Sequence, residues 1–148
     1  MLPWEINGRK IKNFERSEWA TRPSMVNKEL IFLVDELTSY VKKRHDGSVC
    51  IIHVAYETSG HTQDSQHYHG LAVDLHFSGL ALMEQYFCAE RFPFTGIGVY
   101  PYWNRPGLHL DIRKLANRQG ARWWKDKDDE YQELDISLLS QLSREGIA

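Results

Sequence analysis

The chain contains one stretch whose arrangement of polar and small residues decides the fold, Ser65-Gln66-His67-Tyr68-His69-Gly70-Leu71-Ala72-Val73-Asp74. It places an imidazole, His67, and a carboxylate, Asp74, on either side of a glycine and an alanine. Neutral imidazole and carboxylate are ligands that suit Zn²⁺ at neutral pH. Gly70 lets the backbone turn after His67, and the residues after it alternate as a β-strand. The stretch therefore predicts half of a metal site at the start of a strand.

A third ligand is available downstream, in the stretch Gly107-Leu108-His109-Leu110-Asp111. His67, Asp74 and His109 together leave one tetrahedral position of a zinc ion for water. An open position is typical of a catalytic zinc rather than a structural one. We therefore expect one Zn²⁺ per chain at these three residues.

These residues resemble a known family. The pattern Ser-x-His-x-x-Gly-x-Ala-x-Asp, followed by His-x-Asp, is similar to that of zinc D-Ala-D-Ala carboxypeptidases and related phage L-Ala-D-Glu endolysins. The resemblance implies the hedgehog/DD-peptidase zinc fold, with His67, Asp74 and His109 as the zinc ligands. It extends from about Phe14 to about Trp124, so residues 125–148 are interpreted as a C-terminal extension.

Composition fits one soluble globular domain spanning residues 1–148, because 42% of the residues are hydrophobic and 26% are charged. The net charge of −2 gives no electrostatic reason to expect nucleic acid as a partner. No apolar run approaches a membrane span, and the first residues lack the features of a signal peptide. We expect a monomer that is cytoplasmic in the producing cell, or phage-derived and released to act on the cell wall. Cys50 and Cys88 lie in apolar settings without metal-ligand spacing, which favours two buried thiols.

Hydrophobic periodicity predicts an α+β fold in which two main helices flank a small antiparallel sheet that carries the zinc site. One helix follows an N-cap at Ser24 or Asn27, and a second spans residues 79–91 after a cap at Ser78. Residues 49–56 read as a buried central strand, and 72–77, 96–100 and 108–112 as further strands. In 72–77 the alternation puts Asp74 and His76 on one face. A short terminal helix is expected at residues 137–142, and the charged run 125–130 is expected to be solvated surface.

The general base is less well specified. Several relatives place an acid three positions before the last histidine ligand, or a histidine two before it, but this chain has Pro106 and Gly107 there. Asp111 is either the replacement proton shuttle or the acceptor of a hydrogen bond from a ligand imidazole. Glu57 and His69 are further candidates for the base. His53, His61 and His76 are expected to be ordinary core or rim histidines.

Substrate recognition also departs from the relatives. They often carry an arginine after the tyrosine that ends the central strand, whereas Glu57 follows that tyrosine here. Arg113 or Arg105 can supply a guanidinium instead, and this change favours an endopeptidase over a carboxypeptidase. We expect Ser65, Arg113 and Tyr100 to contact the substrate. Tyr100 with Tyr102 and Trp103 forms either an aromatic wall or part of the core.

The function expected from this sequence is that of a zinc metallopeptidase that hydrolyses peptide bonds in peptidoglycan stem or cross-link peptides. The alternative is a non-catalytic zinc-containing module that binds peptidoglycan or a protein partner. The absence of an acid before His109 supports that alternative. A metal-dependent nuclease is disfavoured, because the chain lacks the basic surface that phosphate binding needs.

Overall fold

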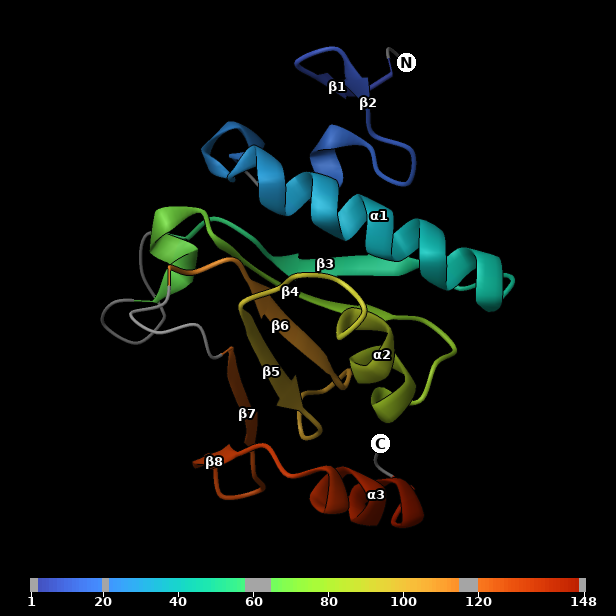
Figure 1. Cartoon of the computed structure of the whole chain (residues 1–148), viewed down its shortest axis with the longest axis vertical. Coiled ribbons are helices and arrows are strands. Elements are labelled where there is room, and N and C mark those ends of the chain that lie inside the picture. Colours follow the sequence, from blue (N-terminus) through green and yellow to red (C-terminus); the bar gives the residue numbers. More distant parts are fainter. Residues whose placement is uncertain (1–2, 20–21, 58–64, 115–119, 147–148) are drawn as a thin grey trace.

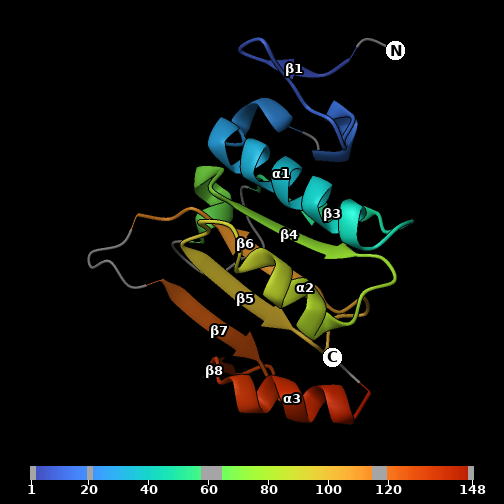
Figure 2. The same cartoon turned by 45° about the vertical axis from the view of Figure 1, so that its right-hand side comes forward.

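The computed structural model describes residues 3–19, 22–57, 65–114 and 120–146, which form one α+β domain with helices packed on a mixed sheet (Figures 1 and 2). The α+β class is as predicted; His61 lies outside the described residues. The helices are α1 (Lys28–Arg44), α2 (Leu82–Ala89) and α3 (Ile136–Arg144), with 3₁₀ turns η1 (Arg16–Trp19), η2 (Pro23–Met25) and η3 (Gln66–His69). The strands are β1 (Glu5–Ile6), β2 (Arg9–Lys10), β3 (Cys50–Val54), β4 (Ala72–Phe77), β5 (Gly96–Tyr100), β6 (Gly107–Asp111), β7 (Ala121–Lys125) and β8 (Tyr131–Glu133).

The main sheet has the strand order β3-β4-β6-β5-β7-β8 over the described residues. Neighbouring strands from β3 to β5 are antiparallel, as expected, but β7 runs parallel to β5. The sheet is therefore mixed rather than wholly antiparallel. A small antiparallel hairpin of β1 and β2 lies apart from it, beyond α1 (Figure 1).

Strand β4 lies between β3 and β6 and is the buried strand of this part of the sheet. All six of its residues are buried, and its alternation directs Val73, Leu75 and Phe77 into the hydrophobic core. The prediction that residues 49–56 form the central strand is wrong, because β3 lies at the sheet edge and Ile51 is 37% exposed. An apolar run cannot distinguish an edge strand covered by a helix from a central one.

Helices α1 and α2 cover the apolar face of the sheet (Figure 2). Asn27 is the N-cap of α1, since its side chain accepts a hydrogen bond from the N–H of Glu29 at 2.8 Å. The predicted cap of α2 is wrong. Ser78 instead accepts from the backbone N–H of Val49 at 2.9 Å, and α2 begins later, at Leu82. Ser78 therefore ties the loop after β4 to the start of β3.

The N-terminal segment is fixed to α1 by a buried carboxylate. Asp35 is 5% exposed and accepts hydrogen bonds from the backbone N–H groups of Lys12 and Asn13, at 3.0 and 2.9 Å. The Asn13 side chain also donates to Asp35 and to its carbonyl. Ile11, Phe14 and Trp19 then reach the same core as the helices.

The C-terminal part extends the sheet and the core. Trp123 and its neighbours form β7, and the charged run after them forms a turn into β8. The predicted terminal helix is observed as α3, whose Leu139 and Leu142 are buried in the main core. None of the helices seen in the described residues combines the length and apolar character needed to cross a membrane.

Candidate metal centre

The three predicted ligands come from three elements that meet on the polar face of the sheet. His67 lies in η3, Asp74 in β4 and His109 in β6. The antiparallel register pairs Asp74 directly with His109. Gly70 ends η3 with φ of 68°, and a Cβ there would lie 2.1 Å from the carbonyl oxygen of Met25. Glycine is therefore required at this position both for its backbone angle and for space.

The ligand atoms converge on one carboxylate oxygen. Asp74 Oδ1 lies 3.2 Å from Nε2 of His67 and 3.0 Å from Nδ1 of His109. All three ligand atoms lie within 4.8 Å of one another. Around a tetrahedral zinc, with bonds of about 2.0–2.2 Å, neighbouring N and O ligands are about 3.3 Å apart. The spacing therefore fits one zinc ion with little side-chain movement.

Hydrogen bonds on the far side of each ring direct a lone pair towards this centre. Nδ1 of His67 lies 2.8 Å from the carbonyl oxygen of Ala55, which only accepts, so Nδ1 carries the hydrogen. Nε2 of His109 donates to Asp111 in the same way, at 2.7 Å. If both histidines are neutral, the remaining nitrogens, His67 Nε2 and His109 Nδ1, face the Asp74 carboxylate without a hydrogen between them. A proton on His109 relieves this repulsion, and a metal ion can take the place of that proton, since the donor set is one that zinc prefers.

The pKa values of the centre reflect the same demand for positive charge. Burial alone would lower the pKa of His109, but hydrogen bonds with Asp111 and Asp74 outweigh it and raise this pKa to about 9. Burial likewise opposes ionisation of Asp74, yet hydrogen bonds from His109 and His67 hold its pKa far below the usual range. The carboxylate is therefore ionised and ready to bind a cation at neutral pH.

Asp111 lies behind His109 and is held in place by Arg113. It is fully buried, and Arg113 donates to it from Nε at 2.9 Å and from Nη2 at 2.6 Å. Burial raises the pKa of Asp111, but the hydrogen bonds from His109 and Arg113 prevail and lower it to about 2. Of the two roles considered for Asp111, this geometry favours the one in which its carboxylate orients the His109 imidazole. The same carboxylate binds the guanidinium of Arg113, which was predicted to contact the substrate.

Two glycines of β5 make room for the groups behind the ligands. A Cβ on Gly96 would lie 2.3 Å from Asp111 Oδ1, and one on Gly98 would lie 2.5 Å from the Trp123 ring. Trp123 lies beside the His109 ring, with centroids 5.1 Å apart, and its Nε1 donates to the hydroxyl of Tyr100 at 3.0 Å. Glycine at both positions therefore leaves the space that the Asp111 carboxylate and the Trp123 ring occupy.

A cleft of about 430 Å³ opens at the ligand Asp74. Its other lining residues come from β3 and from the loop between β5 and β6, namely His53, Val54, Trp103, Asn104 and Arg105. The Trp103 ring stacks on that of Tyr100, with centroids 4.2 Å apart. Of the three aromatic residues considered for a wall, Trp103 lines the cleft, Tyr100 supports its ring by stacking, and Tyr102 is 44% exposed.

His53 and His76 form a pair beside this cleft. Nε2 of His53 lies 2.6 Å from Nδ1 of His76, so one ring donates to the other. Partial burial lowers the pKa of His53, and Arg105 adds to this effect while Asp74 opposes it. The sequence predicted His53 to be an ordinary histidine, because the pairing of its strand with β4, which carries Asp74, is visible only in the structure.

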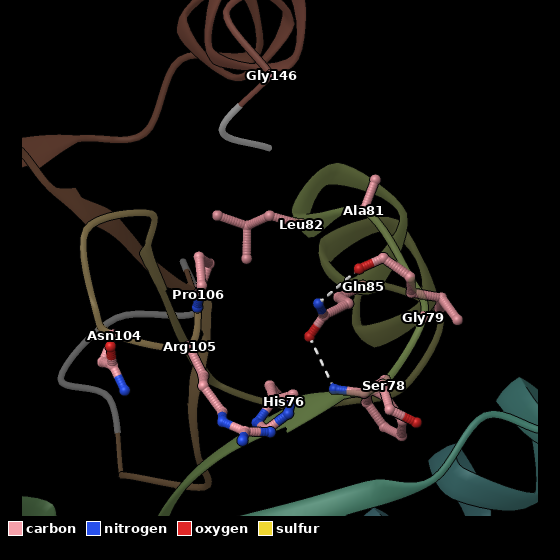
Figure 3. A pocket seen from close by; sticks show the side chains of 12 residues that line it. His76, Ser78, Gly79, Ala81, Leu82, Gln85, Asn104, Arg105, Pro106 and Gly146 are labelled. Carbon is pink, nitrogen blue, oxygen red and sulfur yellow. Dashed lines mark hydrogen bonds between the residues drawn. The ribbon is translucent and has the colours of Figure 1, made fainter.

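Arg105 also borders a second cavity, of about 460 Å³, between the β5–β6 loop and the start of α2 (Figure 3). Figure 3 shows the Arg105 guanidinium next to the His76 ring. On the opposite wall, Gln85 accepts from the N–H of Phe77 and donates to the carbonyl of Leu80, both at 3.0 Å. Arg105 is thus the exposed cation shared by both cavities, in contrast to Arg113.

The remaining predicted site residues lie at the edge of the centre. Ser65 is the N-cap of η3, and its hydroxyl accepts from the N–H of His67 at 3.3 Å. Glu57 is exposed, and its N–H donates to the His67 carbonyl at 3.4 Å. His69 is exposed at the end of η3. The hydrogen bonds of Ser65 and Glu57 therefore hold the backbone around His67 in place.

No protein-family model matches this chain, and comparison with curated proteins finds no match. The resemblance to zinc peptidases therefore remains a prediction from the motif residues.

Proposed function

We propose that this protein is a zinc-dependent peptidase that hydrolyses peptide bonds in peptidoglycan stem or cross-link peptides of the bacterial cell wall. The observation that carries the proposal is the convergence of His67, Asp74 and His109, with Nε2 of His67 and Nδ1 of His109 lying 3.2 and 3.0 Å from the same oxygen of the Asp74 carboxylate. A cleft lined by aromatic and basic side chains opens beside this carboxylate. When bound there, zinc would supply Lewis-acid activation of a carbonyl and of water.

The cleft supports a short peptide with an acidic group as the substrate. Trp103, whose ring stacks on Tyr100, provides a flat apolar surface for the peptide backbone and small side chains. Arg105 provides an exposed guanidinium, which pairs with carboxylates in a bidentate manner. Peptidoglycan stem peptides combine small residues with free carboxylates, and both features match this lining.

Hydrolysis of an amide also requires a group that takes a proton from water and returns it to the leaving amine. Asp111 is poorly placed for this transfer, because His109 and Arg113 already engage it away from the cleft. His53 lies on the cleft wall, and its lowered pKa keeps the imidazole neutral near pH 7. We assign the proton transfer to His53, with His76 holding its ring.

The decisive experiment is incubation of the protein with purified muropeptides, with and without a chelator, followed by mass spectrometry. The expected result is a new amine and a new carboxyl terminus, lost with chelator and restored by zinc. His67→Ala should abolish cleavage while the fold is retained. Binding of muropeptides without cleavage at any pH from about 5 to about 9 would favour the non-catalytic binding module.

A second variant tests the assignment of the base. His53→Gln should lower turnover by about 10²–10⁴-fold, the usual contribution of general acid–base catalysis, while zinc affinity is unchanged. Asp128→Asn, which removes an exposed charge in the turn between β7 and β8, is the matched control. Normal turnover in His53→Gln would show that the base lies elsewhere, with Glu57 and His69 as the next candidates.

A further inference from the structure

A second group of metal-binding side chains lies where the end of α1 meets α2. It consists of His45, Glu84 and Cys88, whose ligand atoms all lie within 4.8 Å of one another. His45 is the C-cap residue of α1. Glu84 and Cys88 are four positions apart in α2, so their side chains lie on the same face of that helix.

The measured contacts are close to those of a coordination sphere. Nε2 of His45 lies 3.1 Å from Oε1 of Glu84, and Sγ of Cys88 lies 4.0 Å from the same oxygen. With zinc bonds of about 2.0–2.2 Å to N and O and about 2.3 Å to sulfur, tetrahedral ligands are about 3.3–3.7 Å apart. The distances from Glu84 to His45 and to Cys88 therefore differ from these values by only a few tenths of an ångström, and the ligand atoms of His45 and Cys88 lie within 4.8 Å of each other.

The exposure of the three residues allows an ion to enter from solvent. The side chains of His45 and Glu84 are 34% and 42% exposed, whereas Cys88 is buried beneath them. The site also lies at the C-terminal end of α1, where the helix dipole favours a cation. Burial and the charge of Glu84 raise the pKa of the Cys88 thiol, while Arg44 and Arg91 oppose this rise and also reduce the attraction for a cation. Cys88 therefore becomes a thiolate ligand only with a metal that binds sulfur strongly.

We propose that His45, Glu84 and Cys88 form a second, thiolate-containing site for a divalent cation such as Zn²⁺ or Co²⁺, which links α1 to α2. Binding replaces the Cys88 thiol proton, which leaves to solvent, and the resulting thiolate joins the imidazole and the carboxylate as ligands. Water completes the coordination. The site is independent of the proposed peptidase centre, which contains no sulfur ligand.

Cobalt titration of the full-length reduced protein tests this proposal, because a cysteine ligand gives a thiolate-to-cobalt charge-transfer absorption in the near ultraviolet. We expect this band in the wild type and in His67→Ala. It should remain in Cys50→Ser, which removes the buried cysteine outside the cluster, and disappear in Cys88→Ser. His45→Gln should weaken cobalt binding at this band by at least about tenfold, since even partners outside the ligand set change metal affinity by that much.

The proposal is overturned if cobalt gives no thiolate band in the wild type, or if the band survives in Cys88→Ser. Circular dichroism of each variant confirms that the helices are retained. If the wild type shows the cobalt–thiolate band but does not cleave muropeptides, the peptidase proposal alone is contradicted. The two failures are therefore distinguishable.

Discussion

At the scale of single residues, Asp111 shows most directly how the centre is built. Its carboxylate fixes the His109 tautomer and is itself fixed by Arg113. Replacing it by asparagine keeps the shape but weakens the hydrogen bond that orients His109. We expect Asp111→Asn to lower zinc affinity by about 10–100-fold, with activity recovering in excess zinc.

A competition titration with a chromophoric chelator measures this change, and Asp128→Asn serves as the control for loss of one carboxylate. The opposite pattern, normal zinc affinity with turnover reduced by about 10²–10⁴-fold, would instead assign proton transfer to Asp111.

Gly96 offers a second test at the residue scale. Its missing Cβ leaves the space that the Asp111 carboxylate occupies. We expect Gly96→Ala to displace that carboxylate and to lower zinc affinity by about tenfold or more. Because this effect acts through Asp111, Gly96→Ala should add little in an Asp111→Asn background. Additive losses in the double variant would show that Gly96 acts by another route.

The sequence predicted the three candidate ligands that the structure brings together, but their supporting groups only in part. The candidates follow from residue type and spacing, since His67, Asp74 and His109 are all recognisable metal-binding groups. The role of Arg113 was not recoverable, because a sequence does not show that its guanidinium turns back onto Asp111 two positions earlier. His53, which we propose as the base, was predicted to be a structural histidine because it lies in an apolar strand context.

At the scale of elements, the attachment of the N-terminal segment to α1 depends on Asp35. Asp35→Ala would leave the buried N–H groups of Lys12 and Asn13 without their acceptor. We expect the free energy of unfolding to fall by about 1–3 kcal/mol, as for other unsatisfied buried donors. Urea denaturation measures the change.

The adjacent variant Glu36→Ala is the matched control, because Glu36 pairs with Arg9 at the exposed surface. Such exposed pairs contribute about 0–1 kcal/mol. Equal destabilisation by the two variants would mean that Asp35 does not anchor the segment.

Elements with strong periodicity were predicted well, and those defined by tertiary context were not. The strands 72–77 and 96–100 and the helix after Asn27 were found because alternation and capping are local signals. Strand β7 was missed because its sequence, with two adjacent tryptophans between Arg122 and Lys125, lacks the alternation typical of a strand, and its parallel pairing with β5 depends on distant residues. The start of α2 was misplaced because the Ser78 hydroxyl bonds to Val49 instead of to its own helix.

At the scale of the whole molecule, the buried thiol of Cys50 makes the free energy of unfolding depend on pH in the alkaline range. Burial raises the pKa of Cys50 from 9.0 to about 12, a change that Thr38 only partly opposes. The thiol therefore stays protonated in the folded state while it ionises in the unfolded state above pH 9. Its contribution to stability is complete below pH 9 and is lost as the pH rises towards 12.

We expect the free energy of unfolding to fall by up to about 1.4 kcal/mol per pH unit in this range because of Cys50. Cys50→Ala should flatten this slope, and chemical denaturation at several pH values gives both curves. The comparison of the two curves cancels the contribution of tyrosines, which also titrate there. Identical slopes would show that Cys50 does not control alkaline stability.

The pairing of β4 with β6 has a consequence for the order of events in folding. Asp74 and His109 are 35 positions apart and become neighbours only in the native register. A slip of one residue would turn His109 towards the helices and Leu108 or Leu110 towards the cleft. Zinc binding at the proposed centre during refolding would therefore report the moment at which β4 and β6 pair in the correct register. A bound ion would favour the native alignment of the strands, since misaligned chains present at most the two local ligands.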